Sequence, residues 1–186
     1  MRYFLELSYN GKNYAGWQRQ DNAVSVQEVL EENLSKIFNT KTEIIGCGRT
    51  DAGVHAKQYF AHVDTEQDLP ENFVYRINKM LPNDISIQQI IEVKPDLHAR
   101  FDAKRRTYKY FIHFDKDPFA DDFSFLLLNK ELNIEKANHC IQQLLGEHDF
   151  STFEKKGSDN KTSGCTLENA YFEQTPHGLV FTITAN

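Results

Sequence analysis

The sequence predicts an α+β fold made of two ferredoxin-like halves, each with an antiparallel sheet and helices on one face. Two observations lead to this prediction. Across the first hundred residues, stretches of alternating apolar residues and stretches with 3.6-residue periodicity follow the order β-α-β-β-α-β of the split βαβ unit. The remaining residues start this order again but stop after β-α-β-β, so we expect the second half to lack its final helix and strand. We therefore place two domains, at residues 1–103 and 104–186.

Four strands and two helices are expected in the first half. The strands, which alternate or are rich in apolar and aromatic side chains, cover residues 3–9, 42–47, 59–63 and 85–93. The first helix starts after Ser25, because Ser25 and Glu28 have the spacing of a capping box. Its apolar face is formed by Val26, Val29, Leu30, Leu34, Ile37 and Phe38. Pro70 opens the second helix. The buried face of that helix holds Phe73, Ile77 and Leu81.

The second half begins with a strand over residues 107–114, followed by an acidic loop over residues 115–122. Residues 123–128 fit either a short strand or an extended connection. A helix follows, and Gly146 ends it. Its apolar face holds Ile134, Ala137, Ile141, Leu144 and Leu145. Polar residues dominate 154–164, which we expect to form a mobile loop. Residues 167–174 and 179–185 predict a hairpin.

Composition predicts a soluble cytoplasmic protein without a membrane-spanning segment. The three cysteines lie far apart and form no CxxC pair, which argues against a cysteine zinc site and fits a reducing compartment. The N-terminal segment Met-Arg-Tyr-Phe-Leu-Glu-Leu reaches a charge too early for the apolar region of a secretory signal peptide. No apolar run approaches the roughly 18 residues that span a bilayer.

The net charge of −6 argues weakly against a nucleic-acid partner, but the charge is unevenly distributed. Five basic residues fall within ten positions, and only Asp102 opposes them. They are Arg100, Lys104, Arg105, Arg106 and Lys109. A local basic stripe matters more for phosphate binding than the charge of the whole chain. The alternative is a solvated strand edge.

The loop between the second and third predicted strands contains the candidate chemistry. Glycines at positions 46, 48 and 53 surround Arg49 and Asp51, and they allow sharp turns and close approach to a ligand. In an extended stretch Arg49 and Asp51 point to the same side, where the guanidinium favours an ionised, nucleophilic carboxylate. A structural turn capped by Asp51 fits the same residues. A metal site formed by Asp51 and Asp64 with His55 and His62 matches no strong motif.

The segment Gly-Arg-Thr-Asp-Ala-Gly-Val-His-Ala at residues 48–56 resembles the signature of the TruA-type tRNA pseudouridine synthases. Other segments of the chain are similar to that family in the same order. They lie at residues 14–20, 25–28, 81–85, 98–103, 106–110 and 146–150. The resemblance covers nearly the whole chain.

The resemblance implies isomerisation of uridine to pseudouridine at positions 38 to 40 of the tRNA anticodon stem-loop. It implies a homodimer that needs no metal or organic cofactor. Asp51 matches the catalytic aspartate, Arg49 an arginine that pairs with it and holds the target nucleotide out of its stack, and Tyr108 a tyrosine that stacks on the base. Flipping a nucleotide costs roughly a few kcal/mol, and the cationic Arg49 offsets part of this.

Uracil must detach, rotate and reattach through carbon, and a proton leaves C5, or C2′ in a glycal route. Tyr108 is a candidate base for this proton. The candidates for RNA contact share a basic or aromatic side chain. They are Tyr108, Arg19, Arg100, Lys104, Arg105, Arg106 and His55.

Two features depart from the family pattern. After residue 186 the family continues with a Met-Val-Arg segment, which supplies a second arginine to the aspartate and a helix to the second half. We therefore expect a trimmed chain, a fragment of a longer protein, or a naturally shorter second domain. Cys165 stands where many relatives carry an arginine. A non-catalytic RNA-binding fragment of such an enzyme is thus the alternative function.

Overall fold

The computed structural model describes residues 1–128, 132–153 and 164–186. They divide into two compact units, Met1–Ala103 and Lys104–Asn186. Each unit is described by itself below. Except for Gly164, the expected polar loop at residues 154–164 lies outside the described residues.

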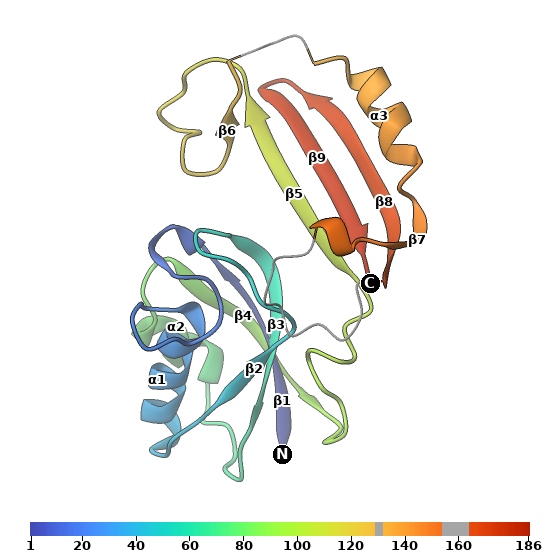
Figure 1. The fold of residues 1–186 in the computed structure, drawn as a ribbon. Helices are drawn as coiled ribbons and strands as arrows, with labels where there is room; N and C mark the ends of the chain where they lie inside the picture. Colours follow the sequence, from blue (N-terminus) through green and yellow to red (C-terminus); the bar gives the residue numbers. More distant parts are fainter. Residues whose placement is uncertain (129–131, 154–163) are drawn as a thin grey trace. The chain divides into compact units, whose positions relative to one another are not determined.

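The first unit is a four-stranded antiparallel sheet with the order β2-β3-β1-β4. Its strands are β1 (Arg2–Tyr9), β2 (Ile44–Gly46), β3 (Ala56–Asp64) and β4 (Ile85–Val93). Its helices are η1 (Gly11–Asn13), α1 (Val26–Phe38) and α2 (Phe73–Met80). Figure 1 shows α1 and α2 against one face of the sheet, and the two helices contact each other. This is the split βαβ arrangement that the order of elements predicts.

The core of the first unit lies between this sheet and the two helices. Side chains alternate along β1, so Leu5 and Leu7 point to the helices and are fully buried. Leu30 and Leu34, four residues apart on α1, meet them with no exposed surface. Burying each such side chain stabilises the fold by roughly 1.5–3 kcal/mol. The apolar spacing along the sequence thus identified the inward faces correctly.

Three element boundaries of the first unit differ from the sequence prediction or refine it. Ser25 caps α1 as expected, since its Oγ accepts a hydrogen bond from the Glu28 N–H at 3.1 Å. The helix α2 begins at Phe73, three residues after Pro70, because Asn72 takes a left-handed conformation with φ of 55° just before it. The strand expected at residues 42–47 is shortened to Ile44–Gly46, since the Thr42 N–H donates to a serine side chain of α1.

The second unit is a five-stranded sheet with the order β6-β5-β9-β8-β7. Its strands are β5 (Arg106–His113), β6 (Phe125–Leu126), β7 (Gly146–Asp149), β8 (Gly164–Thr175) and β9 (Gly178–Ala185). It also contains the helix α3 (Ile134–Gln142) and the short helix η2 (Ser151–Phe153). The predicted hairpin is present as β8 and β9. Within the described residues, this unit holds the β-α-β-β part of the split unit, with β6 and β7 at its edges.

The strand β7 was not predicted from the sequence. For this segment the sequence analysis predicted only that a helix ends at Gly146. Its residues, Gly-Glu-His-Asp, are all exposed and show no alternation. The strand exists because its backbone pairs with β8 over four positions, from Gly146 opposite Leu167 to Asp149 opposite Gly164. The strand β6 is a two-residue parallel pairing with β5, within the segment 123–128 for which the sequence left a short strand or an extended connection open. Both edge strands, β6 and β7, are therefore formed by backbone pairing with a neighbouring strand and not by an alternating pattern of side chains.

In each unit a helix is tied to a strand of its sheet by an asparagine amide. In the first unit, Asn78 donates to the Ile87 carbonyl oxygen at 2.7 Å and accepts from the Ile87 N–H at 2.8 Å. In the second, Asn138 makes the same pair of bonds to Phe172, at 2.9 and 2.7 Å. These amides satisfy backbone groups that have no partner strand on that side.

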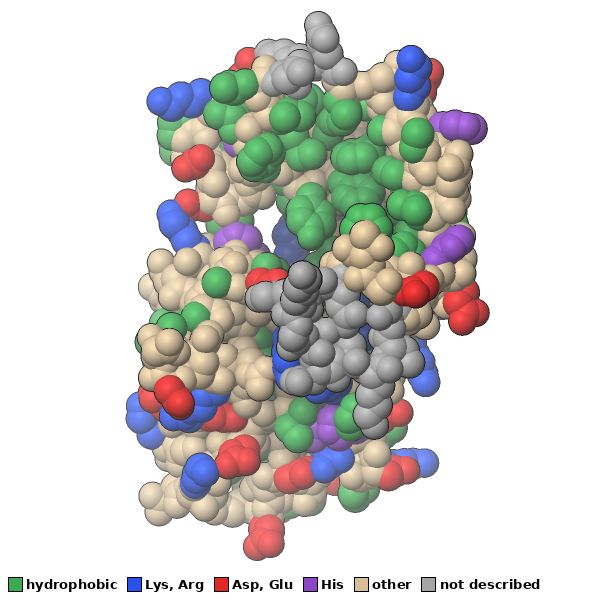
Figure 2. Space-filling model, in the orientation of Figure 1, with side chains coloured by type: hydrophobic (Ala, Val, Ile, Leu, Met, Phe, Trp, Pro, Cys, Tyr) green, Lys and Arg blue, Asp and Glu red, His purple; other side chains and the backbone are tan. Residues whose placement is uncertain are grey.

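The helix α3 packs on β8, and the face of the second sheet over β5 and β9 is apolar, with Tyr108 and Tyr110 of β5 exposed. Figure 2 shows hydrophobic side chains gathered there. A row of rings crosses three strands, with centroids of Tyr110 and Phe181 at 6.2 Å and of Phe181 and Phe172 at 4.7 Å. None of the helices among the described residues is long and apolar enough to cross a membrane.

The helix-free face of the first sheet is covered in part by the turn at residues 97–102. His62 of β3 is the anchor: its Nδ1 accepts a hydrogen bond from the Ala99 N–H at 3.2 Å, and its ring stacks on Phe4. The His62 side chain is buried, with 2% of its surface exposed. Burial, together with the nearby Arg2 and His98, lowers the pKa of His62 to about 4. The imidazole is therefore neutral in the folded protein at neutral pH.

We predict that His62 makes the folded state sensitive to acid. Its pKa is about 6.5 in an unfolded chain and about 4 in the fold. The unfolded state therefore binds a proton first, and stability present above pH 6.5 is lost as the pH falls toward 4, by up to about 3 kcal/mol. In a His62→Gln variant, which keeps an acceptor for the Ala99 N–H, this loss should be absent.

The measurement is urea unfolding of wild type and His62→Gln between pH 7.5 and 4, with exposed His139→Gln as the control. The stability difference between wild type and His62→Gln should shrink with acid, whereas the control should follow wild type. A difference that stays constant across this range would contradict the prediction.

Candidate active site

The loop that joins β2 to β3 presents Arg49 and Asp51, the two charged residues that the sequence analysis singled out. Both side chains are exposed. The loop sits at the end of the sheet where Tyr9 of β1 pairs with Ala56 of β3. A side chain at such a position reaches solvent while the paired strands hold its backbone.

The backbone on either side of Asp51 is tied to the segment that follows β1. The Thr50 carbonyl oxygen accepts a hydrogen bond from the Trp17 N–H at 3.1 Å, and the Gly53 N–H donates to the Tyr14 carbonyl oxygen at 3.2 Å. The Thr50 hydroxyl also pairs with the Tyr9 hydroxyl at 3.0 Å. Asp51 therefore stands on a short stretch of chain held before and after it, as positioned chemistry requires.

Tyr59 of β3 supports the loop from beneath. Its hydroxyl donates to the Gly48 carbonyl oxygen, and its ring stacks on Trp17 with centroids 4.2 Å apart. Burial, with a contribution from Cys47, raises the pKa of the Tyr59 phenol well above its usual range. The phenol therefore remains a hydrogen-bond donor, and it holds the residue directly before Arg49.

Two glycines carry the sharp turns. Gly16 has a φ of 87° and Gly53 a φ of 80°, a region that side chains with a Cβ rarely adopt. They differ in their surroundings. A Cβ on Gly16 would overlap the Thr50 carbonyl oxygen, whereas a Cβ on Gly53 would meet nothing within 4 Å. Gly16 is thus needed for close approach as well as for conformation.

Asp84, directly before β4, holds the segment after β1 on which the Asp51 loop is docked. The Tyr14 hydroxyl donates to its carboxylate at 2.6 Å, and the Asn10 N–H donates to its carbonyl oxygen at 2.8 Å. The fold thereby brings together three segments that resemble the family in sequence, at residues 14–20, 48–56 and 81–85. In the sequence these three segments are separate matches, and the supporting roles of Tyr9, Tyr14 and Tyr59 were not predicted. For Tyr9 and Tyr14, the concentration of aromatic residues before position 18 could have indicated such a role.

The two histidines proposed as metal ligands serve different backbone groups. His55 Nδ1 accepts a hydrogen bond from the Gly11 N–H at 3.1 Å, which binds the end of the loop to η1. His62 Nδ1 accepts the hydrogen bond from the Ala99 N–H, as described above. Among the described residues, no three His, Cys, Asp or Glu side chains come together in a way that could hold a metal ion. The metal hypothesis therefore has no set of ligands in this part of the chain.

Tyr108 belongs to the second unit, whereas Arg49 and Asp51 share one loop of the first. It lies on β5 opposite Ile183 of β9, and 40% of its surface is exposed. Strand alternation puts its side chain on the same face as Tyr110. Tyr108 is therefore a surface tyrosine of its sheet, not a core aromatic.

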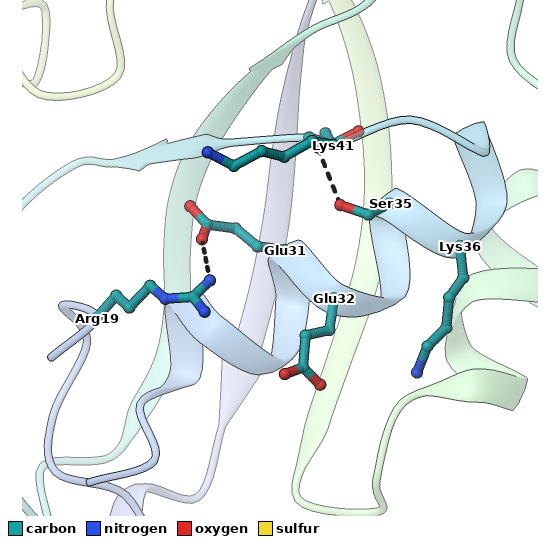
Figure 3. Close-up of a pocket in the computed structure, with 7 residues that line it drawn as sticks. Arg19, Glu31, Glu32, Ser35, Lys36 and Lys41 are labelled. Atoms are coloured by element: carbon teal, nitrogen blue, oxygen red, sulfur yellow. Dashed lines mark hydrogen bonds and ion pairs between the residues drawn. The ribbon is translucent and has the colours of Figure 1, made fainter. Parts of the chain in front are cut away.

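Two of the expected RNA-contacting arginines are paired with carboxylates. Arg19 lies 3.3 Å from Glu31 and 3.4 Å from Glu28, and Arg105 lies 3.0 Å from Glu168. Figure 3 shows Arg19 reaching Glu31 across an open pocket of about 270 Å³ on α1, which is lined by residues of both charges. Glu31 is nearly buried and also accepts from the Ile44 N–H at 3.2 Å, so Arg19 neutralises a structural carboxylate. Lys104 is exposed, and Arg106 is partly buried.

Comparison with known proteins gives a consistent result. The family model described as tRNA pseudouridine synthase matches residues 7–102, which include the whole loop of Asp51 and its supports. Tyr108 lies outside that matched range. The chain is also similar over its whole length to tRNA pseudouridine synthase A of Parabacteroides distasonis, with 42% identity covering 74% of that protein. The Bacteroides fragilis protein of the same name gives the same two values. That of Clostridium acetobutylicum is 37% identical over 98% of this chain and 75% of its own length.

We predict that Gly16→Ala is more damaging than Gly53→Ala, although both residues have positive φ. Each change costs about 1–2 kcal/mol for the left-handed conformation. Gly16→Ala adds about 1–3 kcal/mol because the new methyl group collides with the Thr50 carbonyl oxygen. The chain has a single tryptophan, Trp17, so its fluorescence during urea unfolding reports on this region directly. Equal costs for the two variants would show that the loop does not depend on this close approach.

Proposed function

This chain belongs to the tRNA pseudouridine synthase family, and we propose that it converts uridine to pseudouridine at positions 38 to 40 of the tRNA anticodon stem-loop with Asp51 as the nucleophile. The family match and the relatives identify an isomerase that modifies tRNA. The observation that supports the finer proposal is the exposed Asp51 on a loop whose backbone is held at Thr50 and Gly53. A carboxylate fixed in this manner approaches a substrate with little loss of freedom.

Asp51 acts on the bond between uracil and ribose. Its carboxylate forms a bond to C1′ of ribose as the bond between N1 of uracil and C1′ breaks. The detached uracil rotates so that C5 faces C1′, and the bond from C5 to C1′ forms as the bond between the Asp51 carboxylate and C1′ breaks. The proton on C5 then leaves for a base, and N1 gains a proton, so the product is an isomer of the substrate. A glycal route, in which the C2′ proton leaves first, uses the same carboxylate.

Arg49 stands two residues before Asp51 with its guanidinium exposed. A uridine inside a stem hides its glycosidic bond, so the nucleotide must leave the stack at a cost of roughly a few kcal/mol. We assign Arg49 to hold the flipped nucleotide by contacts to phosphate or base and to pair with Asp51. An arginine suits this task because its planar fork of donors matches phosphate oxygens.

Tyr108 is our candidate for the residue that stacks on the uracil ring and receives the proton. Its 40% exposure on β5 is compatible with contact to a nucleotide. RNA phosphates would be held by the basic residues near it in sequence, which are Arg100, Lys104, Arg105 and Arg106, together with Arg19 and His55. In this proposal residues 1–103 form the domain that contains the catalytic loop, and residues 104–186 form the domain that contains Tyr108. The enzyme works in the cytoplasm as a homodimer without a cofactor.

We expect Asp51→Asn to lower the rate of pseudouridine formation by at least about 1,000-fold, since an amide of the same shape is no nucleophile. The variant should still bind tRNA, because the loop backbone is held through Thr50 and Gly53. Pseudouridine is mapped in tRNA incubated with wild type, with Asp51→Asn, and with Asp68→Asn, an exposed aspartate of the same unit, as control. Modification by Asp51→Asn at the wild-type rate would reject the nucleophile. Binding of tRNA without modification by wild type would favour a non-catalytic RNA-binding protein.

A pair of substitutions separates the two roles of Tyr108. Tyr108→Phe keeps the stacking ring and removes the hydroxyl, so it should lower kcat by about 100- to 10,000-fold with little change in KM if the phenol takes the proton. Tyr108→Ala removes both and should also raise KM. Single-turnover kinetics on tRNA distinguish the variants. If Tyr108→Phe is as active as wild type, another group receives the proton.

A further inference from the structure

Phe101 is an apolar ring displayed to solvent at the helix-free face of the first sheet. Its exposed fraction is 75%, whereas Ala99, two residues earlier, is 3% exposed. Burying a phenylalanine contributes roughly 1.5–3 kcal/mol, and the fold forgoes this at Phe101. The turn that carries Phe101 is not a loose tip, so the exposure needs another explanation.

The turn is built by an internal set of hydrogen bonds. The His98 N–H donates to the Asp102 carboxylate at 2.7 Å, and the Asp102 N–H donates to the His98 carbonyl oxygen at 2.9 Å. His98 Nδ1 accepts from the Arg100 N–H at 3.2 Å and from the Phe101 N–H at 3.4 Å. The N–H groups of His98, Arg100, Phe101 and Asp102 are therefore each bonded within the turn.

The turn is also anchored to the sheet at two points. His62 accepts the Ala99 N–H, and the Arg2 guanidinium donates to the Leu97 carbonyl oxygen at 2.8 Å. The ring of His98 meets His62 edge-on, with centroids 4.7 Å apart. The exposed ring of Phe101 thus rests on buried supports, and it is presented without the entropy cost of ordering a flexible loop.

The surroundings of Phe101 suit a nucleic-acid base better than the core of a protein interface. The Arg100 guanidinium lies 6.0 Å from the centroid of the ring, and the His98 ring lies 4.3 Å away, tilted by 30°. An apolar protein interface buries a contiguous patch with few charges. A single aromatic ring beside a cation is what proteins offer to unpaired bases, since the ring stacks on the base and the cation meets the phosphate.

The position of the turn separates it from the target nucleotide. The loop of Asp51 leads into β3 at Ala56, and His62, the anchor of the turn, lies six residues further along that strand. At about 3.3 Å per residue, the two sites are on the order of 20 Å apart along the sheet. A nucleotide on Phe101 is therefore a different one from the uridine at Asp51.

We propose that Phe101 is a stacking platform for an unpaired base of the bound RNA, with Arg100 beside it, at a second contact site away from the reaction centre. This inference rests on the proposal that the chain binds tRNA. The platform acts on affinity and on the register of the RNA, whereas Asp51 acts on the chemical step.

The test is binding of the full chain to unfractionated bacterial tRNA, measured by fluorescence anisotropy at fixed salt, for wild type, Phe101→Trp, Phe101→Leu and Phe101→Ala. Loss of one stacked base should raise Kd at least about fivefold in the Leu and Ala variants. Phe101→Trp should bind as tightly as wild type or more tightly. The matched control is Phe119→Leu, because Phe119 is 93% exposed on a loop of the second unit. It should leave Kd unchanged.

Ultraviolet cross-linking supplies a direct readout. A nucleotide attached to the peptide that contains Phe101 supports the platform, and its absence in Phe101→Leu shows that the ring makes the contact. Kd values for Phe101→Leu and Phe101→Ala equal to wild type would overturn the inference. So would a Phe101→Leu variant that binds like wild type while only Phe101→Ala is weakened, because that result indicates apolar burial rather than stacking.

The same samples separate this inference from the proposed function. Wild type that forms pseudouridine, with Phe101 variants of unchanged Kd, would reject only the platform. Wild type that binds tRNA through Phe101 but forms no pseudouridine would reject only the catalytic proposal. Thermal unfolding of every variant shows that the exposed substitution has left the fold intact.

Discussion

The candidate site depends on the backbone hydrogen bonds that dock the Asp51 loop on the segment after β1. Trp17 donates to Thr50 and Gly53 donates to Tyr14, so the two residues that flank the Asp51–Ala52 pair are each held by one strong contact. Without these contacts the loop would be a glycine-rich connection with many conformations. With them, the position of one carboxylate is decided by groups that lie more than thirty residues away in sequence.

That docking is itself a consequence of the sheet. The strands β1 and β3 pair from Arg2 opposite Asp64 to Tyr9 opposite Ala56, so the segment leaving β1 and the loop entering β3 emerge at the same end. The stacked rings of Trp17 and Tyr59 fill the space beneath, and Asp84 at the start of β4 holds Tyr14 in place. Packing, pairing and hydrogen bonds agree at this end of the sheet, which is the consistency expected of a specified site.

The helix-free face of the first sheet holds a turn instead of a catalytic loop. On the helix-free face, His62 and Arg2 fasten a turn whose outermost residue is an exposed aromatic ring. In the second unit, an asparagine amide ties α3 to β8 as another ties α2 to β4, while aromatic side chains of β5 remain exposed. The same local device thus recurs in two halves that expose very different surfaces.

The sequence by itself determined the fold class, the inward faces of the strands and helices of the first unit, and the family, because alternation, helical periodicity and motif order are local properties. The helix predicted to reach Gly146 ends at Gln142, and none of its residues is buried. It named Asp51 and Arg49, although the glycine loop alone also fits a capping turn and only the resemblance of other segments to the family favoured a catalytic aspartate. Only the tertiary structure decided that Tyr9, Tyr14, Trp17 and Tyr59 support this loop, and that His55 and His62 bind separate backbone groups. The strand β7 was not predicted and β6 was left open between a short strand and an extended connection, because both exist through backbone pairing with another strand. Such contacts depend on which elements become adjacent after folding, and no local pattern encodes that.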